Sequence, residues 1–426
     1  MRSAIVGTGL LLAALAGSGG LASGAEEGKR PVPPNPGPCP NDPSAPLPQR
    51  VNNAIDLGVA WLKKMVPADG DFGHVSSGTV YGGGSEPSYG YPAGSTALAA
   101  YTLLRCGVPP DDPLLVRIFG WLRKRNATPQ TSYEISMLIL AVEARAQAIA
   151  ARDPPKGGKK PAAPRLPAAE LAWIKDLVAQ LVRRRQQRPG WRYNFADPPA
   201  TGPIDSDASI GGDLDNSSTQ LAMLALAAGE RCGFKQPDET YLATARWLID
   251  QQEKDGPAVI RPDTPEGPSA VADRARGWTY LPRERKAPEP PTGSMTACAM
   301  ASLTIAGSIL AERKNPVWLK GLADQADRAW TDGSAWFLAN WSIPRNPNGS
   351  CHYYYLYCIE RAGDLRGASL LGGRDWYTEG AQYLVDAQYP NGSWWGLNDY
   401  RPEELLGTCF ALLFLKRATR AVATDR

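Results

Sequence analysis

Six segments of the chain are apolar on nearly every side, and each follows a segment that is apolar on one side only. A helix that is apolar all round has to be buried, whereas a helix with one polar face lies at a surface. The alternation therefore predicts six helix pairs, each with one buried and one half-exposed member, and an internal repeat of this kind determines the architecture. The six apolar segments are residues 97–104, 137–141, 221–228, 297–303, 353–359 and 410–415.

The half-exposed segments share an aromatic residue that is followed directly by an aliphatic one. Charged residues accompany several of these pairs, as in Lys63-Lys64, and they give each helix one wet face. The pairs are Trp61-Leu62, Trp121-Leu122, Trp173-Ile174, Trp247-Leu248 and Tyr383-Leu384.

A closed ring satisfies this pattern better than an open stack of helix pairs. An open stack leaves both layers partly wet and needs polar caps at its two ends. Closing six pairs into a ring buries the apolar layer without caps. We therefore expect an all-α fold, an (α/α)6 toroid, with Gly107 and Gly233 as the left-handed residues after two of the buried helices.

A second signature repeats in register with the helix pairs. Its fullest copy lies in the last helix pair and follows the pattern G-x2-Y-L-x3-Q-x3-G-x-W. The residues that match are Gly380, Tyr383, Leu384, Gln388, Gly392 and Trp394. We expect the Gln amide to bond backbone groups left free at helix ends, with the aromatic ring stacked over the junction. Incomplete copies occur at residues 61–72, 181–191, 247–256 and 333–336.

This pattern resembles the QW motif of triterpene cyclases, and it departs from that motif at Glu379, where the family has a basic residue. The chain from residue 49 to 418 thus resembles the prenyltransferase and squalene oxidase repeat superfamily, in particular the C-terminal squalene-cyclase-like toroid. The resemblance implies the ring fold, and a fold alone does not imply a reaction.

One segment offers catalytic chemistry. Asp213-Leu214-Asp215-Asn216 resembles the D-x-D-D-T motif of class II terpene cyclases, which implies Asp215 as a general acid and Asp213 as its companion. Asn216 and Ser217 replace the third Asp and the Thr of that motif. The alternative is that Asp215 caps a buried helix, as Asp, Asn and Ser do at helix starts.

Aromatic residues in the connecting segments are candidates for a ligand cavity at a mouth of the ring. The alternative is that they are motif and core residues. Together with His352, the candidates are Tyr91, Trp191, Tyr193, Trp278, Tyr353, Trp394 and Trp395. Triterpene cyclases have their cavity between two helical barrels, whereas this chain is long enough for only one. We therefore expect a binding or interaction scaffold for an apolar or isoprenoid molecule or another envelope protein, with a terpenoid-cyclase-like or prenyltransferase-like enzyme as the alternative.

We expect neither a metal nor a cofactor. Protein prenyltransferases bind zinc through Asp, Cys and His, but Cys351 and His352 are adjacent and point about 100° apart on a helix, so they do not readily share a metal. Carboxylate pairs of the kind that glycosidases use stay open as an alternative, because no spacing selects one.

The N-terminus predicts export. Residues 1–25 have a basic start, an apolar centre and small residues before Glu26, as signal peptides do; an uncleaved anchor is the alternative. A proline-rich linker, residues 26–48, precedes the toroid at residues 49–420 and a tail at 421–426. No later segment is expected to cross a membrane. The seven cysteines are expected to be mainly free and buried, and the net charge of +3 argues against nucleic acid as a partner.

Overall fold

The structure of the protein is a computed structural model. It describes residues 43–66, 70, 92–124, 131–152, 167–185, 188–192, 214–259, 273–282, 289–395 and 404–417. The expected signal peptide, most of the linker, and the candidate site residues Tyr91, Tyr193 and Asp213 lie outside these residues.

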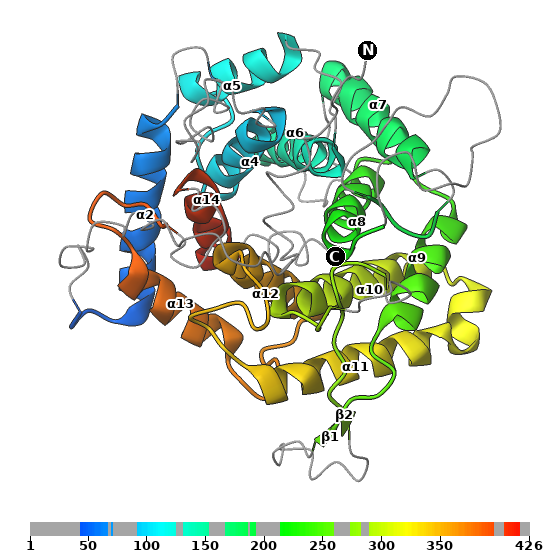
Figure 1. Cartoon of the computed structure of the whole chain (residues 1–426). Helices are drawn as coiled ribbons and strands as arrows, with labels where there is room; N and C mark the ends of the chain where they lie inside the picture. Colours follow the sequence, from blue (N-terminus) through cyan, green and yellow to red (C-terminus); the bar gives the residue numbers. More distant parts are fainter. Residues whose placement is uncertain are drawn as a thin grey trace, which may run out of the picture.

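The helices form two concentric rings (Figure 1). Outer and inner helices alternate along the chain, which confirms the predicted all-α (α/α)6 toroid. The outer ring consists of α2 (Leu47–Lys64), α5 (Pro113–Lys124), α7 (Ala168–Arg184), α9 (Asp238–Gln251), α11 (Ala323–Asn340) and α13 (Trp376–Ala387). The inner ring consists of α4 (Pro92–Arg105), α6 (Ser132–Arg152), α8 (Asn216–Arg231), α10 (Gly293–Glu312), α12 (His352–Arg366) and α14 (Glu404–Leu415).

The inner ring is closed by contacts between its first and last helices. Each inner helix packs against the next one along the chain, and α14 then packs against α4 and against the outer helix α2. The six apolar segments of the sequence all lie in inner helices, so their burial follows from the closure.

Burial explains why α10 is apolar on every side. By length and hydropathy, this helix alone among the described residues could cross a membrane, which the sequence analysis did not anticipate. Yet 78% of its most apolar stretch is buried inside the ring. The composition of α10 is that of an inner helix enclosed by its neighbours.

A pair of short strands and a π-helical turn lie between the α-helices. Strands β1 (Ala258–Val259) and β2 (Asp273–Arg274) form an antiparallel pair in the connection between α9 and α10. A π-helical turn, η1 (Trp318–Leu322), leads into α11, and Gly321 within it has a positive φ of 118°. Gly107 and Gly233, the glycines predicted to follow two of the buried helices, both have a φ of 89°, as expected after a helix.

Tryptophans join the two rings in the same way at three places. The indole N–H groups of Trp191, Trp278 and Trp394 donate to the carbonyl oxygens of leucines near the ends of α7, α9 and α13, at 2.9, 2.7 and 2.8 Å. The backbone N–H of each tryptophan donates to a threonine on the following inner helix, at 3.0 to 3.2 Å. Each tryptophan therefore ties the end of an outer helix to the start of an inner one. The leucine and threonine partners are Leu181, Leu248 and Leu384, and Thr219, Thr296 and Thr408.

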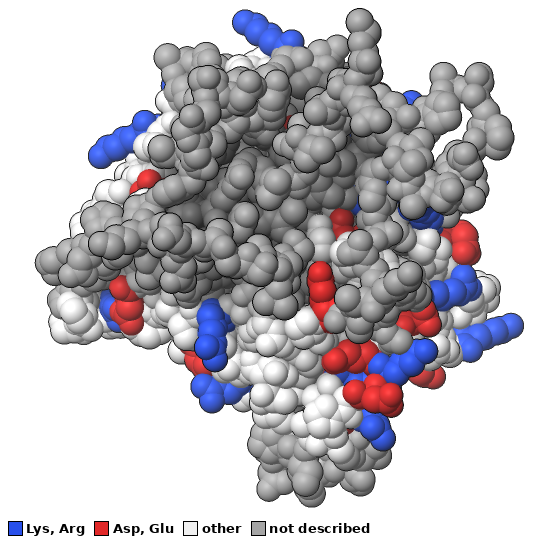
Figure 2. Space-filling view, in the orientation of Figure 1, with Lys and Arg blue, Asp and Glu red and all other residues white. Residues whose placement is uncertain are grey.

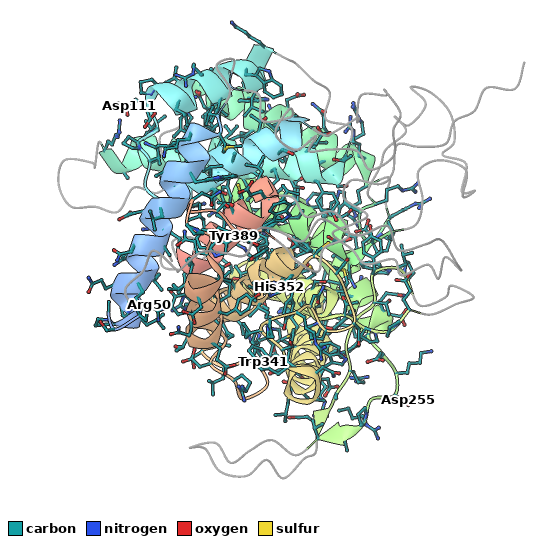
Figure 3. The ribbon with its side chains drawn as sticks, turned by 60° about the vertical axis from the view of Figure 1, so that its left-hand side comes forward. Arg50, Asp111, Asp255, Trp341, His352 and Tyr389 are labelled. Carbon is teal, nitrogen blue, oxygen red and sulfur yellow. The ribbon has the colours of Figure 1, made fainter. Side chains whose placement is uncertain are left out.

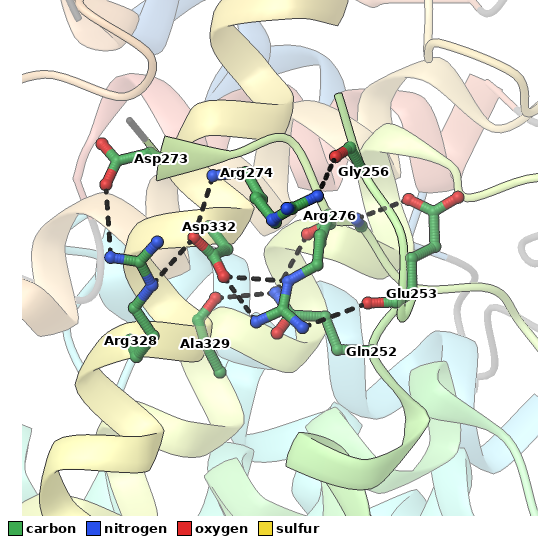
Figure 4. Close-up of polar contacts among 10 residues, drawn as sticks. Gln252, Glu253, Gly256, Asp273, Arg274, Arg276, Arg328, Ala329 and Asp332 are labelled. Carbon is green, nitrogen blue, oxygen red and sulfur yellow. Dashed lines mark hydrogen bonds and ion pairs between the residues drawn. The ribbon is translucent and has the colours of Figure 1, made fainter. Parts of the chain in front are cut away.

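Two glutamines of the repeat join consecutive outer helices. Their acceptors lie inside the neighbouring outer helix and in a connecting segment, and not at free helix ends as expected from the motif. Gln388 Nε2 donates to the carbonyl oxygens of Ala54 and Gly392, both at 2.9 Å, and so links the last outer helix to the first. Gln252 Nε2 donates in the same way to Ala329 and Arg276, at 2.8 and 3.0 Å (Figure 4).

A buried ion-pair network reinforces the junction around Gln252. The Asp332 carboxylate, which is 1% exposed, contacts the guanidinium of Arg276 at 2.5 Å and that of Arg328 at 3.3 Å (Figure 4). It also accepts a hydrogen bond from the backbone N–H of Arg274 at 3.2 Å. The segment that contains β2 is thereby held against α11.

The structure corrects two features of the repeat assignment. The fourth copy lacks a tryptophan at the expected spacing, and Trp278 fills that place after an insertion of about twenty residues. The partial copy at residues 333–336 is no junction, because Gly333 and Trp336 lie inside α11.

Replacing Gln388 by Ala should destabilise the ring where it closes. Two buried carbonyl oxygens, those of Ala54 and Gly392, would lose a donor, at a cost of about 2 to 4 kcal/mol in the free energy of unfolding. Urea denaturation measures the difference. Gln382→Ala, at a half-exposed position on α13, is the matched control and should change the free energy by less than about 0.5 kcal/mol. Equal effects of the two changes would contradict the joining role of Gln388.

Candidate functional site

The Asp215 carboxylate caps α8. It is 1% exposed, and its Oδ1 accepts a hydrogen bond from the backbone N–H of Ser218 at 2.6 Å. This is the geometry of a helix N-cap, in which a side-chain oxygen satisfies a free N–H of the first turn. The neighbouring Asn216 donates from its side chain to the carbonyl oxygen of Thr279 at 2.8 Å and holds the same helix start.

Burial changes the acidity of Asp215. It raises the pKa of this carboxyl from 3.8 to about 7, although hydrogen bonds from Ser218, Ser217 and Tyr280 act in the opposite direction. Part of the population is therefore protonated at neutral pH. A general acid needs such a proton, but it also needs to reach a substrate.

A chain of polar side chains crosses the centre of the ring next to this cap. The Tyr133 hydroxyl donates to Ser217 Oγ at 2.5 Å, and Ser217 Oγ lies 2.8 Å from the Tyr354 hydroxyl. Tyr354 in turn lies 3.4 Å from the sulfur of Cys298, which lies 3.4 Å from the sulfur of Cys358. These five residues, the central cluster, come from α6, α8, α10 and α12, and each is at most 3% exposed.

Three members of the central cluster, Tyr133, Tyr354 and Cys358, are uncharged at neutral pH. Burial raises the pKa values of Tyr133, Tyr354 and Cys358 well above their usual range. Phe410 of α14 packs edge-on against Tyr354, with ring centroids 5.5 Å apart. Neutral buried phenols and thiols such as these are poor bases and nucleophiles.

The three tryptophans named as cavity candidates lie between the rings. Trp191, Trp278 and Trp394 are fully buried, and their indole N–H groups bond the carbonyl oxygens at helix ends described above. Their placement is that of motif and core residues, not of the lining of an open cavity.

His352 lies at the start of α12 (Figure 3). Its Nε2 lies 2.6 Å from the carbonyl oxygen of Ile343, so this nitrogen carries the proton and donates it. Its ring contacts those of Tyr353 and Tyr383, and burial lowers its pKa from 6.5 to about 4. His352 is therefore a neutral packing residue at pH 7.

Tyr353 also lies at the packed start of α12, and its hydroxyl is 3.5 Å from the carbonyl oxygen of Trp395. Trp395 itself is half-buried in the connection between α13 and α14. Cys351 has a left-handed backbone, with a φ of 62°, and His352 follows it directly. Among the residues that the structure describes, no group of three or more His, Cys, Asp and Glu side chains could hold a metal ion.

A cavity of about 370 Å³ opens elsewhere, between the two rings near the C-terminal ends of α10 and α12. The sequence analysis did not identify it. Trp318 of η1 and Trp330 of α11 form its walls, and small residues of α10, among them Gly307 and Ala311, form its floor. A Cβ atom on Gly307 would come within 2.8 Å of the Trp318 ring, so the glycine lets the ring lie across the helix.

Thr304, Ser308, Asp327 and Arg366 contribute polar or charged groups to the lining of this cavity. The indole nitrogen of Trp330 is buried and has no hydrogen-bond partner among the described residues. The Arg366 guanidinium lies 5.1 Å from the centre of the Trp330 ring and pairs with Asp327 at 2.9 Å. Val317 and Leu319, which flank Trp318 in sequence, are 45% and 59% exposed. An apolar cleft with a few placed polar groups is typical of a ligand site.

The described charges on the face seen in Figure 2 are mixed, with Lys and Arg interspersed among Asp and Glu around the rim. Among the described residues, Arg313 pairs with Glu230 and Asp238, at 2.5 and 2.7 Å.

Comparisons with known proteins give a distant likeness. No family model matches the chain, and no curated protein matches it. Among solved structures, the chain is similar to an inactive variant of the alpha-1,6-mannanase of Salegentibacter sp. HEL1_6 in complex with alpha-1,6-mannotriose. The two share 11% sequence identity with a TM-score of 0.48, over 88% of this chain and 99% of that chain.

The raised pKa of Asp215 predicts a specific pH dependence of stability. A carboxyl whose folded pKa exceeds its unfolded pKa stabilises the fold fully below about 4, and this contribution is lost as the pH rises through about 7. Asp215→Asn keeps a capping oxygen and does not titrate. The free energy of unfolding of the wild type, minus that of the variant, should fall by about 2 to 4 kcal/mol between pH 4 and 7.5.

Denaturant titrations of both proteins across this range give the difference. His352 acts in the opposite sense, since its lowered pKa costs stability as the pH falls from 6.5 to 4. Its contribution is common to both proteins and cancels. A difference that stays constant with pH would show that Asp215 titrates at its ordinary pKa in the folded protein.

Proposed function

We propose that this protein is an exported binding scaffold, a toroid that holds an apolar ligand and does not transform it. The proposal rests on one observation: the Asp215 carboxylate caps α8, next to the hydrogen-bonded side chains of the central cluster. Among the described residues, Asp215 adjoins hydrogen-bonded polar side chains, whereas carbocation chemistry requires an apolar, aromatic-lined cavity. The export part of the proposal depends on residues 1–25, which lie outside the described residues.

The cavity between α10, η1, α11 and α12 is the binding site in this proposal. Its floor and walls are largely apolar, and its volume of about 370 Å³ is within the range of small-molecule sites. Thr304, Ser308 and the Arg366–Asp327 pair supply polar groups to this lining. An apolar chain that carries one hydroxyl group, such as an isoprenoid alcohol, suits a lining of this kind.

A terpenoid-cyclase-like enzyme is the second candidate, and the pKa of Asp215 favours it. A carboxyl that titrates near pH 7 keeps a proton available at neutral pH, as a general acid should. The two candidates differ in the fate of the ligand, which is recovered unchanged from a scaffold and cyclised by an enzyme.

Radiolabelled farnesol, an isoprenoid alcohol, tests the proposal in one experiment with two readouts. Equilibrium dialysis measures binding to the purified protein, and chromatography of the extracted label identifies any product. We expect farnesol to bind and to be recovered unchanged. Ala311 lines the cavity and is exposed, so Ala311→Trp places an indole in the space that the ligand would occupy. We expect this change to weaken binding at least tenfold.

Two variants serve as controls. Val116→Trp makes the same kind of change at an exposed position on α5, where Val116 is 49% exposed, and should bind as the wild type does. Asp215→Asn should also bind normally. A cyclised product that the wild type forms and Asp215→Asn does not would overturn the scaffold proposal. Equal binding by Ala311→Trp and the wild type would exclude the cavity as the site, and no binding at all would exclude this ligand class.

A further inference from the structure

Two thiols of the central cluster face each other between neighbouring helices of the inner ring. Cys298 of α10 and Cys358 of α12 are both fully buried, and their sulfur atoms lie 3.4 Å apart. The two residues are sixty positions apart in sequence, and the packing of α10 against α12 brings them together. Neither thiol has a role in the proposed binding site.

The geometry of this pair suits a covalent bond. A disulfide has a sulfur–sulfur distance of about 2.05 Å, so the two atoms have to approach by roughly 1.4 Å. The Cys298 sulfur also contacts the Tyr354 hydroxyl at 3.4 Å, which places it on the side of α10 that faces α12. We propose that Cys298 and Cys358 form a disulfide that cross-links two neighbouring helices of the inner ring.

The bond forms by thiol–disulfide exchange with a small disulfide such as oxidised glutathione. One cysteine thiolate attacks this disulfide, forms a mixed disulfide and releases one glutathione thiolate. The second cysteine thiolate then attacks the protein sulfur of the mixed disulfide and releases the other. The protein loses two electrons and two protons, the oxidant gains the two electrons, and the two released thiolates take up the protons.

Exchange has to occur before the ring closes. Both sulfurs are fully buried in the folded protein, and burial raises the pKa of Cys358 far above its usual range, so this thiol is inert there. During folding both thiols are accessible. An oxidising compartment, such as the one that the proposed export implies, favours the bond, although the geometry of the pair does not depend on export.

The cross-link encloses the chain from Cys298 to Cys358, which includes η1 and α11 and thus one wall of the cavity. Restricting the unfolded chain in this way stabilises a fold, and for a loop of this length it should raise the melting temperature of the protein by about 5 °C. The oxidised and reduced proteins therefore differ in a measurable way apart from the bond itself.

Refolding of the full-length protein tests the proposal. The denatured, reduced protein is refolded with a mixture of reduced and oxidised glutathione and is then unfolded in acidified denaturant, which prevents further exchange. Free thiols are alkylated with iodoacetamide in fresh denaturant, and digested peptides are mapped by mass spectrometry. We expect the peptide with Cys298 joined to the peptide with Cys358, and a melting temperature about 5 °C above that of protein refolded with reducing agent.

Variants separate this bond from accidental pairing. Cys298→Ser should leave Cys358 alkylated and abolish the rise in melting temperature, whereas Cys232→Ser, at another buried cysteine, should keep the link. Peptide mapping of the wild type shows whether Cys298 and Cys358 are linked even where a variant does not fold. Quantitative alkylation of both cysteines in refolded wild type, or a link of either one to a different cysteine, would overturn the proposal. Neither outcome bears on farnesol binding, so the two proposals fail independently.

Discussion

The inner helices have no side that can face water, and the architecture follows from this requirement. In an open stack of helix pairs, the first and last inner helices would each expose an apolar face. The contact of α14 with α4 removes both ends, so the six inner helices enclose one another while the outer helices cover them (Figure 1). The outer ring closes at the same place, where Gln388 bonds the Ala54 carbonyl and Arg50 pairs with Asp386 at 2.5 Å.

The residues that stand out in the sequence hold this ring together. Trp394 bonds a carbonyl oxygen near the end of α13, Asp215 caps the start of α8, and Gln388 bonds a carbonyl oxygen inside α2. Groups engaged in this way have little freedom to bind a ligand. The proposed binding site is instead the cavity between the rings, which Trp318 and Trp330 line.

The sequence predicts the ring because its signals are local: the period of apolar residues, the spacing from Leu384 to Trp394, and the glycines after helices. It does not predict what depends on distant segments. Trp278 takes the place of a missing motif residue after an insertion, so spacing alone cannot assign it. The cavity depends on the π-helical turn at Trp318 and on helices far apart in sequence. The contact between Cys298 and Cys358 likewise exists only once α10 and α12 are packed together.

Native-state hydrogen exchange tests most directly whether the six pairs form one closed ring. In a closed ring, amide protons in the middle turns of α4 and α14 are as well enclosed as those of α8, and all three helices open together. The account predicts the same free energy of opening for the three helices within about 1 kcal/mol. A much lower free energy for α4 and α14 than for α8 is the result expected of an open stack with two free ends, and it would contradict the account.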